Sequence, residues 1–96
     1  MELKAPSESL NSAGMITAAQ CRAARALLEW SQQELANAAG IGVVTVHQLE
    51  AAASKPRPAT MDVIRRAFES SGIEFIDENG GGQGVRFRKP RKPKKD

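Results

Sequence analysis

The 96-residue sequence contains few of the side chains that enzymes and metal sites usually need. It has one histidine, His47, one cysteine, Cys21, and no tyrosine. A single cysteine cannot form an intramolecular disulfide, which favours a reducing, cytoplasmic compartment over a secreted scaffold. One histidine leaves almost no material for a metal site or a Ser-His-Asp arrangement, and the glycines at 80–82 follow no phosphate-loop pattern. We therefore expect neither an enzyme nor a bound cofactor.

Long apolar runs are also missing. No stretch approaches the roughly 20 apolar residues of a membrane-spanning helix, and residues 1–14 lack the apolar segment of a signal peptide. Residues 1–14 hold few large apolar side chains, so we predict a flexible leader there. A chain of 96 residues is expected to form one domain with a small core, for which dimerisation is a reasonable expectation.

The net charge of +3 is distributed unevenly. Residues 15–84 carry six basic and eight acidic side chains, whereas residues 85–96 carry seven basic and one acidic. Prolines in this last segment prevent a helix, and we predict a basic disordered tail at 90–96. The basic side chains at this end either contact a nucleic-acid backbone or only keep the protein in solution: Arg88, Lys89, Arg91, Lys92, Lys94 and Lys95.

Two capping boxes predict where the first two helices begin. T-x-x-Q at 17–20 and S-x-x-E at 31–34 each allow two side chains to satisfy backbone N–H groups that the first helical turn leaves free. The first box predicts an alanine-rich helix over 18–29, in which Cys21 is expected to be a small core residue. The second predicts a short helix that ends before Gly40, because glycine adopts the left-handed conformation without steric cost.

Two more helices and a hairpin are expected in the second half of the chain. The pattern predicts a helix from about Val43 to Ala52 and another from Met61 to Ser71, capped by Thr60. Apolar and charged residues then alternate on both sides of DENGGGQG, which predicts a β-hairpin at 73–89. Two strands alone are marginally stable, so the helices or a second copy of the chain must cover the apolar side chains, among them Phe75, Ile76 and Phe87.

The stretch from Gln32 to Glu50 has a recurring spacing of small and apolar residues. Counted from Gln32, Ala36 is fifth and Gly40 ninth, so that two helices can cross closely around a turn. Val46 and Leu49 then stand fifteenth and eighteenth, where they bury the second helix against the first. With the capping boxes, this stretch resembles the helix-turn-helix of the phage-repressor-like (Cro and lambda repressor type, xenobiotic-response-element) family.

The resemblance covers about residues 16–72 and implies a fold. It implies a mainly α, four-helix, lambda-repressor-like DNA-binding domain at 15–72, followed by the short C-terminal hairpin. It also implies that Arg25 pairs with Glu50, as the corresponding residues do in several relatives; the alternative is that both are solvated surface charges.

The resemblance further implies that the third helix enters the major groove of DNA. It assigns base reading to five residues of that helix: Val43, Val44, Thr45, His47 and Gln48. Relatives often carry polar residues at the two valine positions. A valine can contact a thymine methyl group but cannot form a bidentate hydrogen bond to a base edge, so readout would fall mainly on the other three. A protein–protein contact is the alternative role of the valines.

Phosphate contacts are expected at two places. Gln32 and Gln33 begin the second helix, where free N–H groups and the helix dipole favour an anion. Lys55 and Arg57 follow the third helix, where relatives touch the DNA backbone. The implied partners are double-stranded DNA and a second copy of the chain, and the implied location is the cytoplasm, for a protein encoded by a bacterium or a phage. The alternative is a protein-binding module of the same fold, such as an antitoxin or an antiactivator.

Overall fold

The computed structural model describes residues 15–53 and 56–90. The predictions for the leader at 1–14, for Lys55 and for tail residues 91–96 lie outside the described residues. The described chain is mainly helical and ends in an antiparallel hairpin, which confirms the predicted fold class. Its elements are α2 (Ala18–Leu28), α3 (Gln32–Ala39), α4 (Val43–Glu50), α5 (Pro58–Ser70), β1 (Ile73–Ile76) and β2 (Gly84–Phe87).

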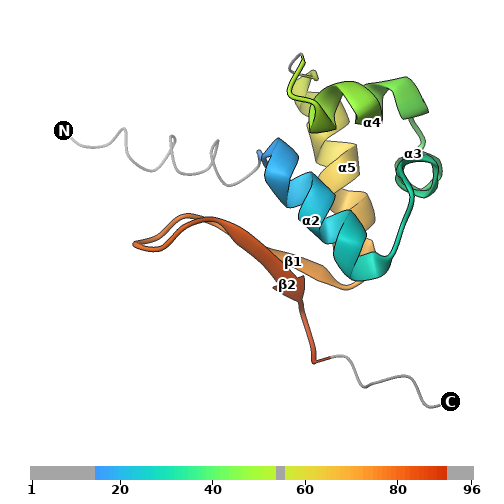
Figure 1. Cartoon of the computed structure of the whole chain (residues 1–96). Coiled ribbons are helices and arrows are strands. Elements are labelled where there is room, and N and C mark those ends of the chain that lie inside the picture. Colours follow the sequence, from blue (N-terminus) through green and yellow to red (C-terminus); the bar gives the residue numbers. More distant parts are fainter. Residues whose placement is uncertain (1–14, 54–55, 91–96) are drawn as a thin grey trace, which may run out of the picture.

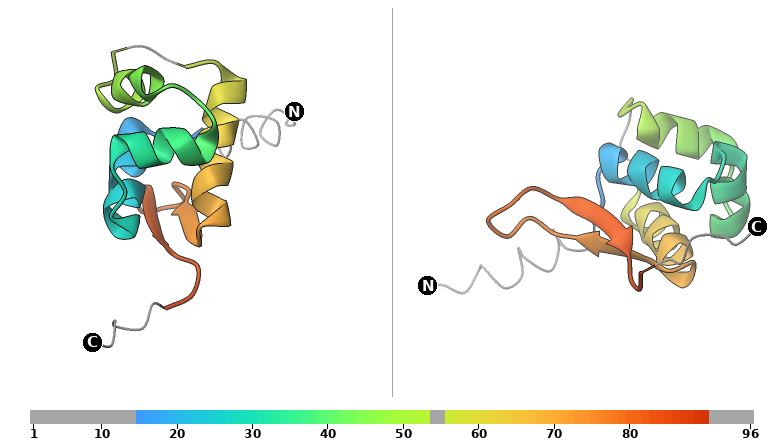
Figure 2. Two further views of the ribbon diagram at one scale, coloured as in Figure 1. Left: turned by 90° about the vertical axis from the view of Figure 1, so that its right-hand side faces the viewer. Right: turned by 60° about the horizontal axis from the view of Figure 1, so that its bottom comes forward.

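Helix α2 lies between α4 and the hairpin (Figure 1). Figure 1 shows α4 at the top of the molecule and the β1–β2 hairpin at the bottom, with α2 between them and α5 behind. The turned views in Figure 2 keep α4 and the hairpin on opposite sides of α2. The two ends of the molecule therefore present different surfaces.

Both predicted capping boxes are present. The Gln20 N–H donates to Thr17 Oγ1 at 3.0 Å, and the Thr17 N–H donates to Gln20 Oε1 at 2.9 Å. Ser31 and Glu34 exchange the same pair of bonds at the start of α3. Gly40 follows α3 with φ +73°, the left-handed conformation that the sequence predicted there.

Two helix boundaries differ from the predicted ones. The last helix begins at Pro58 rather than at Met61, and its N-cap is Arg57, so Thr60 lies inside the helix and does not cap it. Proline favours the first helical position because its fixed φ is already helical and its missing N–H would have no helical partner. Helix α4 ends at Glu50 rather than near Ala52, because Ala52 adopts the left-handed conformation at φ +56°.

One core joins the four described helices to β1. Its fully buried side chains include Leu35, Val46, Ile64, Phe68 and Ile73, and Cys21 is also buried, as predicted. Trp30 lies partly buried against this core with its ring centroid 5.7 Å from that of Phe68. The aromatic stack fixes the segment between α2 and α3 against α5.

Helices of the same chain cover the apolar face of the hairpin. Ile73 pairs with Phe87 and Phe75 with Val85, and all four side chains belong to or pack against the core. The Phe75 ring also lies 5.2 Å from the guanidinium carbon of Arg65 in α5. Of the two alternatives that the sequence left open, the structure therefore shows covering by the helices.

Gln20 fastens the hairpin to α2. Its side chain is 6% exposed, and the amide nitrogen donates to the Gly84 carbonyl at 3.0 Å and to the Ile76 carbonyl at 3.5 Å. The amide oxygen meanwhile accepts the Thr17 N–H of the capping box. One buried amide thus caps α2 and satisfies carbonyl groups of both strands.

Candidate nucleic-acid interface

Helices α3 and α4 form a closely packed pair. Ala36 is fully buried in the core. Its small side chain lets α3 and α4 cross closely, as the sequence predicted. Val46 and Leu49 bury the inner face of α4, with exposed fractions of 0% and 5%. Since the turn between the helices is closed by the Ile41 N–H donating to the Ala36 carbonyl at 3.0 Å, α4 has a fixed position relative to α3.

The five predicted base-reading residues are divided between two environments. Val44, His47 and Gln48 are exposed and lie on one face of α4, because residues three and four positions apart share a helix face. Val43 is partly buried and packs against the core, and Thr45 is also partly buried. The outward face of α4 therefore consists of one apolar and two polar side chains.

The buried end of α4 carries a charged group, the carboxylate of Glu50, which is 6% exposed. Arg25 donates to it twice, from Nε to Oε2 at 2.7 Å and from Nη2 to Oε1 at 2.8 Å. Gln32 Nε2 donates to Oε1 at 2.9 Å and Cys21 Sγ to Oε2 at 3.2 Å. The predicted pairing of Arg25 with Glu50 is confirmed, and this Glu50 network joins α2, α3 and α4.

The ionisation states in the network follow from these contacts. Burial by itself would raise the pKa of the Glu50 carboxyl, but the hydrogen bonds from Arg25, Gln32 and Cys21 outweigh it and hold that pKa below its usual value. Two effects raise the pKa of the Cys21 thiol well above its usual range: burial, which is the larger, and the hydrogen bond to Glu50. Glu50 is therefore charged and Cys21 neutral near pH 7, which suits a structural cysteine and not a reactive one.

Two arginines of α2 also satisfy backbone carbonyls. Arg22 Nη1 donates to the Glu50 carbonyl, one of the carbonyl groups left without a helical partner at the end of α4. Arg25 Nη1 donates to the Trp30 carbonyl at 2.9 Å. The sequence did not single out Arg22. The orphan carbonyls at the end of a helix signal that some donor is needed, but the chain alone does not identify which side chain supplies it.

The predicted phosphate contacts have differing surroundings. The Gln32 amide is engaged with Glu50, whereas the exposed Gln33 amide donates only along its own helix, to Asn37 Oδ1 at 3.0 Å. Arg57 is exposed at the N-cap of α5. Gln33 and Arg57 thus remain accessible from solvent.

The basic residues after β2 are only partly within the structure. Arg88 Nη2 donates to the Glu69 carbonyl near the end of α5 at 2.6 Å, and Lys89 is exposed. The other predicted tail residues, Arg91, Lys92, Lys94 and Lys95, lie outside the described residues. Arg88 therefore has a contact with the folded domain that the sequence did not indicate.

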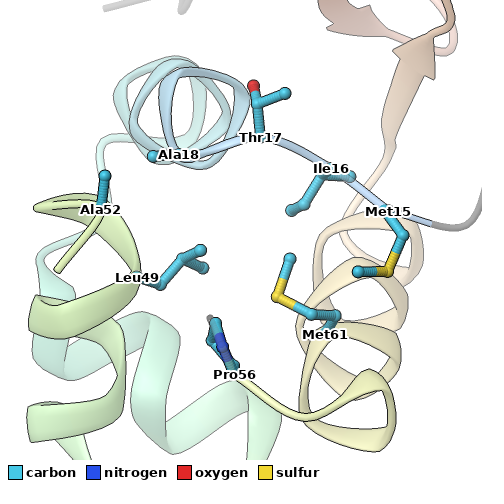
Figure 3. Close-up of a pocket in the computed structure, with 8 residues that line it drawn as sticks. All are labelled: Met15, Ile16, Thr17, Ala18, Leu49, Ala52, Pro56 and Met61. Carbon is cyan, nitrogen blue, oxygen red and sulfur yellow. The ribbon is translucent and has the colours of Figure 1, made fainter. Parts of the chain in front are cut away.

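A pocket of about 400 Å³ lies beneath α4, between the start of α2, the end of α4 and the start of α5. Figure 3 shows Leu49, Ile16 and Met61 pointing toward one another across it. Its lining is mostly apolar and carries no charged side chain. The pocket therefore adjoins the inner face of α4 and not the face that carries Val44.

Across residues 15–53 and 56–90, no three or more His, Cys, Asp or Glu side chains form a group that could hold a metal ion. No helix in these ranges has the length and apolar character required to cross a membrane.

The chain was also compared with known protein families. Residues 22–75, more than half of the chain, match a family described as helix-turn-helix. No curated protein matches the chain. The family match includes α3, the turn at Gly40 and the whole of α4, together with the Arg25–Glu50 pair. The chain therefore belongs to the helix-turn-helix family of the xenobiotic-response-element and lambda-repressor type, whose members are DNA-binding regulators.

Proposed function

We propose that this protein is a transcriptional repressor that binds an inverted-repeat operator as a dimer, with α4 of each copy in the major groove. The observation that carries the proposal is the division of α4 into two faces. Its inner face is buried and is held to α2 by the bond between Glu50 and Arg25. On its outer face, Val44, His47 and Gln48 are exposed. A rigid helix with an accessible face is suited to contact base edges without a large ordering cost.

Base reading and phosphate binding fall to different residues in this proposal. Gln48 can form two hydrogen bonds with adenine N6 and N7, and His47 and Thr45 add polar contacts. Val43 has a smaller share, since it packs against the core. Gln33, with Lys55 and Arg57, contacts phosphates on either side of the groove, whereas the side-chain amide of Gln32 is engaged with Glu50. The basic residues from Arg88 onward add charge that is independent of sequence.

Dimerisation follows from the size of the site. One helix reads only about half a turn of the groove, and a two-fold dimer places two such helices in half-sites about 34 Å apart. The hairpin is the proposed contact. The apolar side chains of the hairpin that face the helices are covered within the chain, so support comes from the strand edges. In the described residues the sheet has only β1 and β2, each with an outer edge that another strand can pair with. A monomer in sedimentation at tens of micromolar would contradict this contact.

The decisive experiment combines selection with titration. DNA bound by the full chain is selected from random duplexes, and the selected and a shuffled duplex are then titrated in gel shifts at two salt concentrations. We expect the selected duplex to bind at least about 1,000-fold more tightly at physiological salt. Inserting five base pairs between the half-sites should abolish this preference, because the insertion places the two half-sites on opposite faces of the DNA double helix.

Matched variants make the assay specific to α4. Gln48→Ala should reduce the preference for the selected duplex, whereas Asp62→Asn, an exposed change on α5, should leave it unchanged. Repression predicts in addition that the protein reduces transcription from a promoter that overlaps the selected site, because occupancy blocks the polymerase.

A second candidate function is a protein-binding module, as in an antitoxin or an antiactivator. The 62% exposure of Val44 favours it, because an exposed apolar side chain also suits a protein interface. This candidate predicts equal binding to selected and shuffled duplexes, so the same titration separates the two functions.

A further inference from the structure

Val44 is the most exposed large apolar side chain in the described part of the molecule. Its exposed fraction is 62%, against 41% for Met15 and 37% for Leu27. It is the second residue of α4 and shares its face with His47 and Gln48, one turn further along. An apolar group at this position is in water in the free protein and is available to whatever α4 contacts.

The two neighbouring valines differ in surroundings. Val43 packs against the core and is partly buried, so it holds the first turn of α4 in place. Val44 has no such contact with the core. In a helix the β-branched valine side chain has one strongly preferred rotamer, so its two methyl groups are held in nearly one position before any partner arrives.

The chemistry of the major groove offers one partner for such a group. Base edges there present hydrogen-bond donors and acceptors, which valine cannot use, and a single apolar group, the C5 methyl of thymine. Resting on the proposed function, we propose that Val44 determines specificity by contacting a pyrimidine C5 methyl group at a fixed position of each half-site. Thymine supplies that methyl in ordinary DNA, and 5-methylcytosine carries the same group.

The test removes the methyl group and leaves the base pair intact. Each thymine of the selected half-site is replaced in turn by deoxyuridine, and the dissociation constant of the full chain is measured. At one position the substitution should weaken binding about fourfold, because burial of one methyl group contributes about 0.8 kcal/mol, and about 16-fold when both half-sites are changed. With Val44→Ala, the preference for thymine over deoxyuridine at that position should shrink, because the shorter side chain buries less of the methyl group.

Two variants serve as controls. Val44→Ala removes an exposed side chain and places a better helix former in α4, so its melting temperature should stay close to that of the wild type. Gln48→Ala should weaken binding to the selected duplex and to each of its deoxyuridine derivatives by the same factor, so the fourfold preference for thymine should remain. Replacing the critical T·A pair by C·G and then by 5-methyl-C·G identifies the source of the methyl group. If 5-methyl-C·G restores the affinity of the wild type, Val44 recognises any pyrimidine C5 methyl group. If it does not, Val44 recognises thymine alone.

Two results would overturn the inference. One is a selected duplex that is bound selectively but shows no deoxyuridine effect at any thymine, which would leave the proposed function standing. The other is a deoxyuridine effect of equal size in the wild type and in Val44→Ala. Failure to find any selectively bound duplex would instead overturn both this inference and the proposed function.

Discussion

Glu50→Gln tests whether the buried carboxylate holds α4 in place. The substitution keeps the size of the side chain but removes its charge, and it sets an amide NH₂ among the three donors Arg25, Gln32 and Cys21. Breaking one partner of a buried ion pair costs about 3–5 kcal/mol. The Arg25 side chain is 21% exposed and keeps some contact with water, so we expect the lower end, about 3 kcal/mol. In a domain of this size that loss lowers the melting temperature by about 12–24 °C.

The pH dependence separates loss of charge from loss of shape. Folding lowers the pKa of the Glu50 carboxyl, so its charged form stabilises the fold above the unfolded-state pKa of about 4.3. This contribution is lost as the pH falls through the folded-state pKa. The difference in unfolding free energy between wild type and Glu50→Gln should therefore be full at pH 7 and shrink below about pH 4. Urea unfolding curves at several pH values measure it directly.

An exposed ion pair supplies the matched control. Glu74 and Arg86 pair across the hairpin at 3.2 Å with side chains 43% and 63% exposed, so Glu74→Gln should cost only about 0.5 kcal/mol. A cost of Glu50→Gln no larger than that of this control would refute a stabilising role for the buried carboxylate. A cost as large at pH 3 as at pH 7 would refute it too, because the carboxyl of the unfolded chain is protonated at pH 3 and its charged form then stabilises the fold less.

Ala52→Gly should raise the unfolding free energy by about 0.5–1 kcal/mol, since Ala52 holds φ +56° and glycine adopts it without strain; an unchanged urea midpoint would refute this. Gln20→Ala should accelerate amide hydrogen exchange in β1 and β2 more than in α4, because the hairpin loses its buried anchor; equal acceleration everywhere would count against it. Native Cys21 should react with a thiol reagent only as fast as the protein unfolds, since burial raises the pKa of this thiol; burst labelling at neutral pH would show otherwise. Deletion after Arg88 should flatten the dependence of log affinity on log salt by about 0.9 for each phosphate contact removed, and an unchanged slope would exclude a role for the tail.

Patterns confined to neighbouring residues predicted the framework well. Both capping boxes, the turn at Gly40 and the buried positions Val46 and Leu49 are set by contacts within α2, α3 and α4 or between adjacent helices. The pairing of Arg25 with Glu50 was predicted through the family resemblance, because no local pattern connects residues that far apart.

Contacts that depend on the packed fold were not predictable in the same way. The Gln20 amide reaches the Gly84 carbonyl across 64 positions of sequence, and its role in the capping box gave no indication of the second partner. The Gln32 amide was expected at a phosphate, and its donation to Glu50 depends on how α3 crosses α4. The start of α5 was misplaced for a local reason: the predicted helix began at Met61 and left out Pro58, although proline suits the first position of a helix.

The position of the Gln20 anchor has a practical consequence for engineering. Its amide contacts carbonyls of Ile76 and Gly84, the last paired residues of the ladder before the hairpin loop. Residues 77–83 beyond that point are all exposed, and Figure 1 shows the loop extending away from the helices on the side remote from α4. The ladder is thus closed before the loop begins, so an insertion there need not disturb it. A fluorophore or an affinity peptide inserted into this loop would leave the outer face of α4 clear.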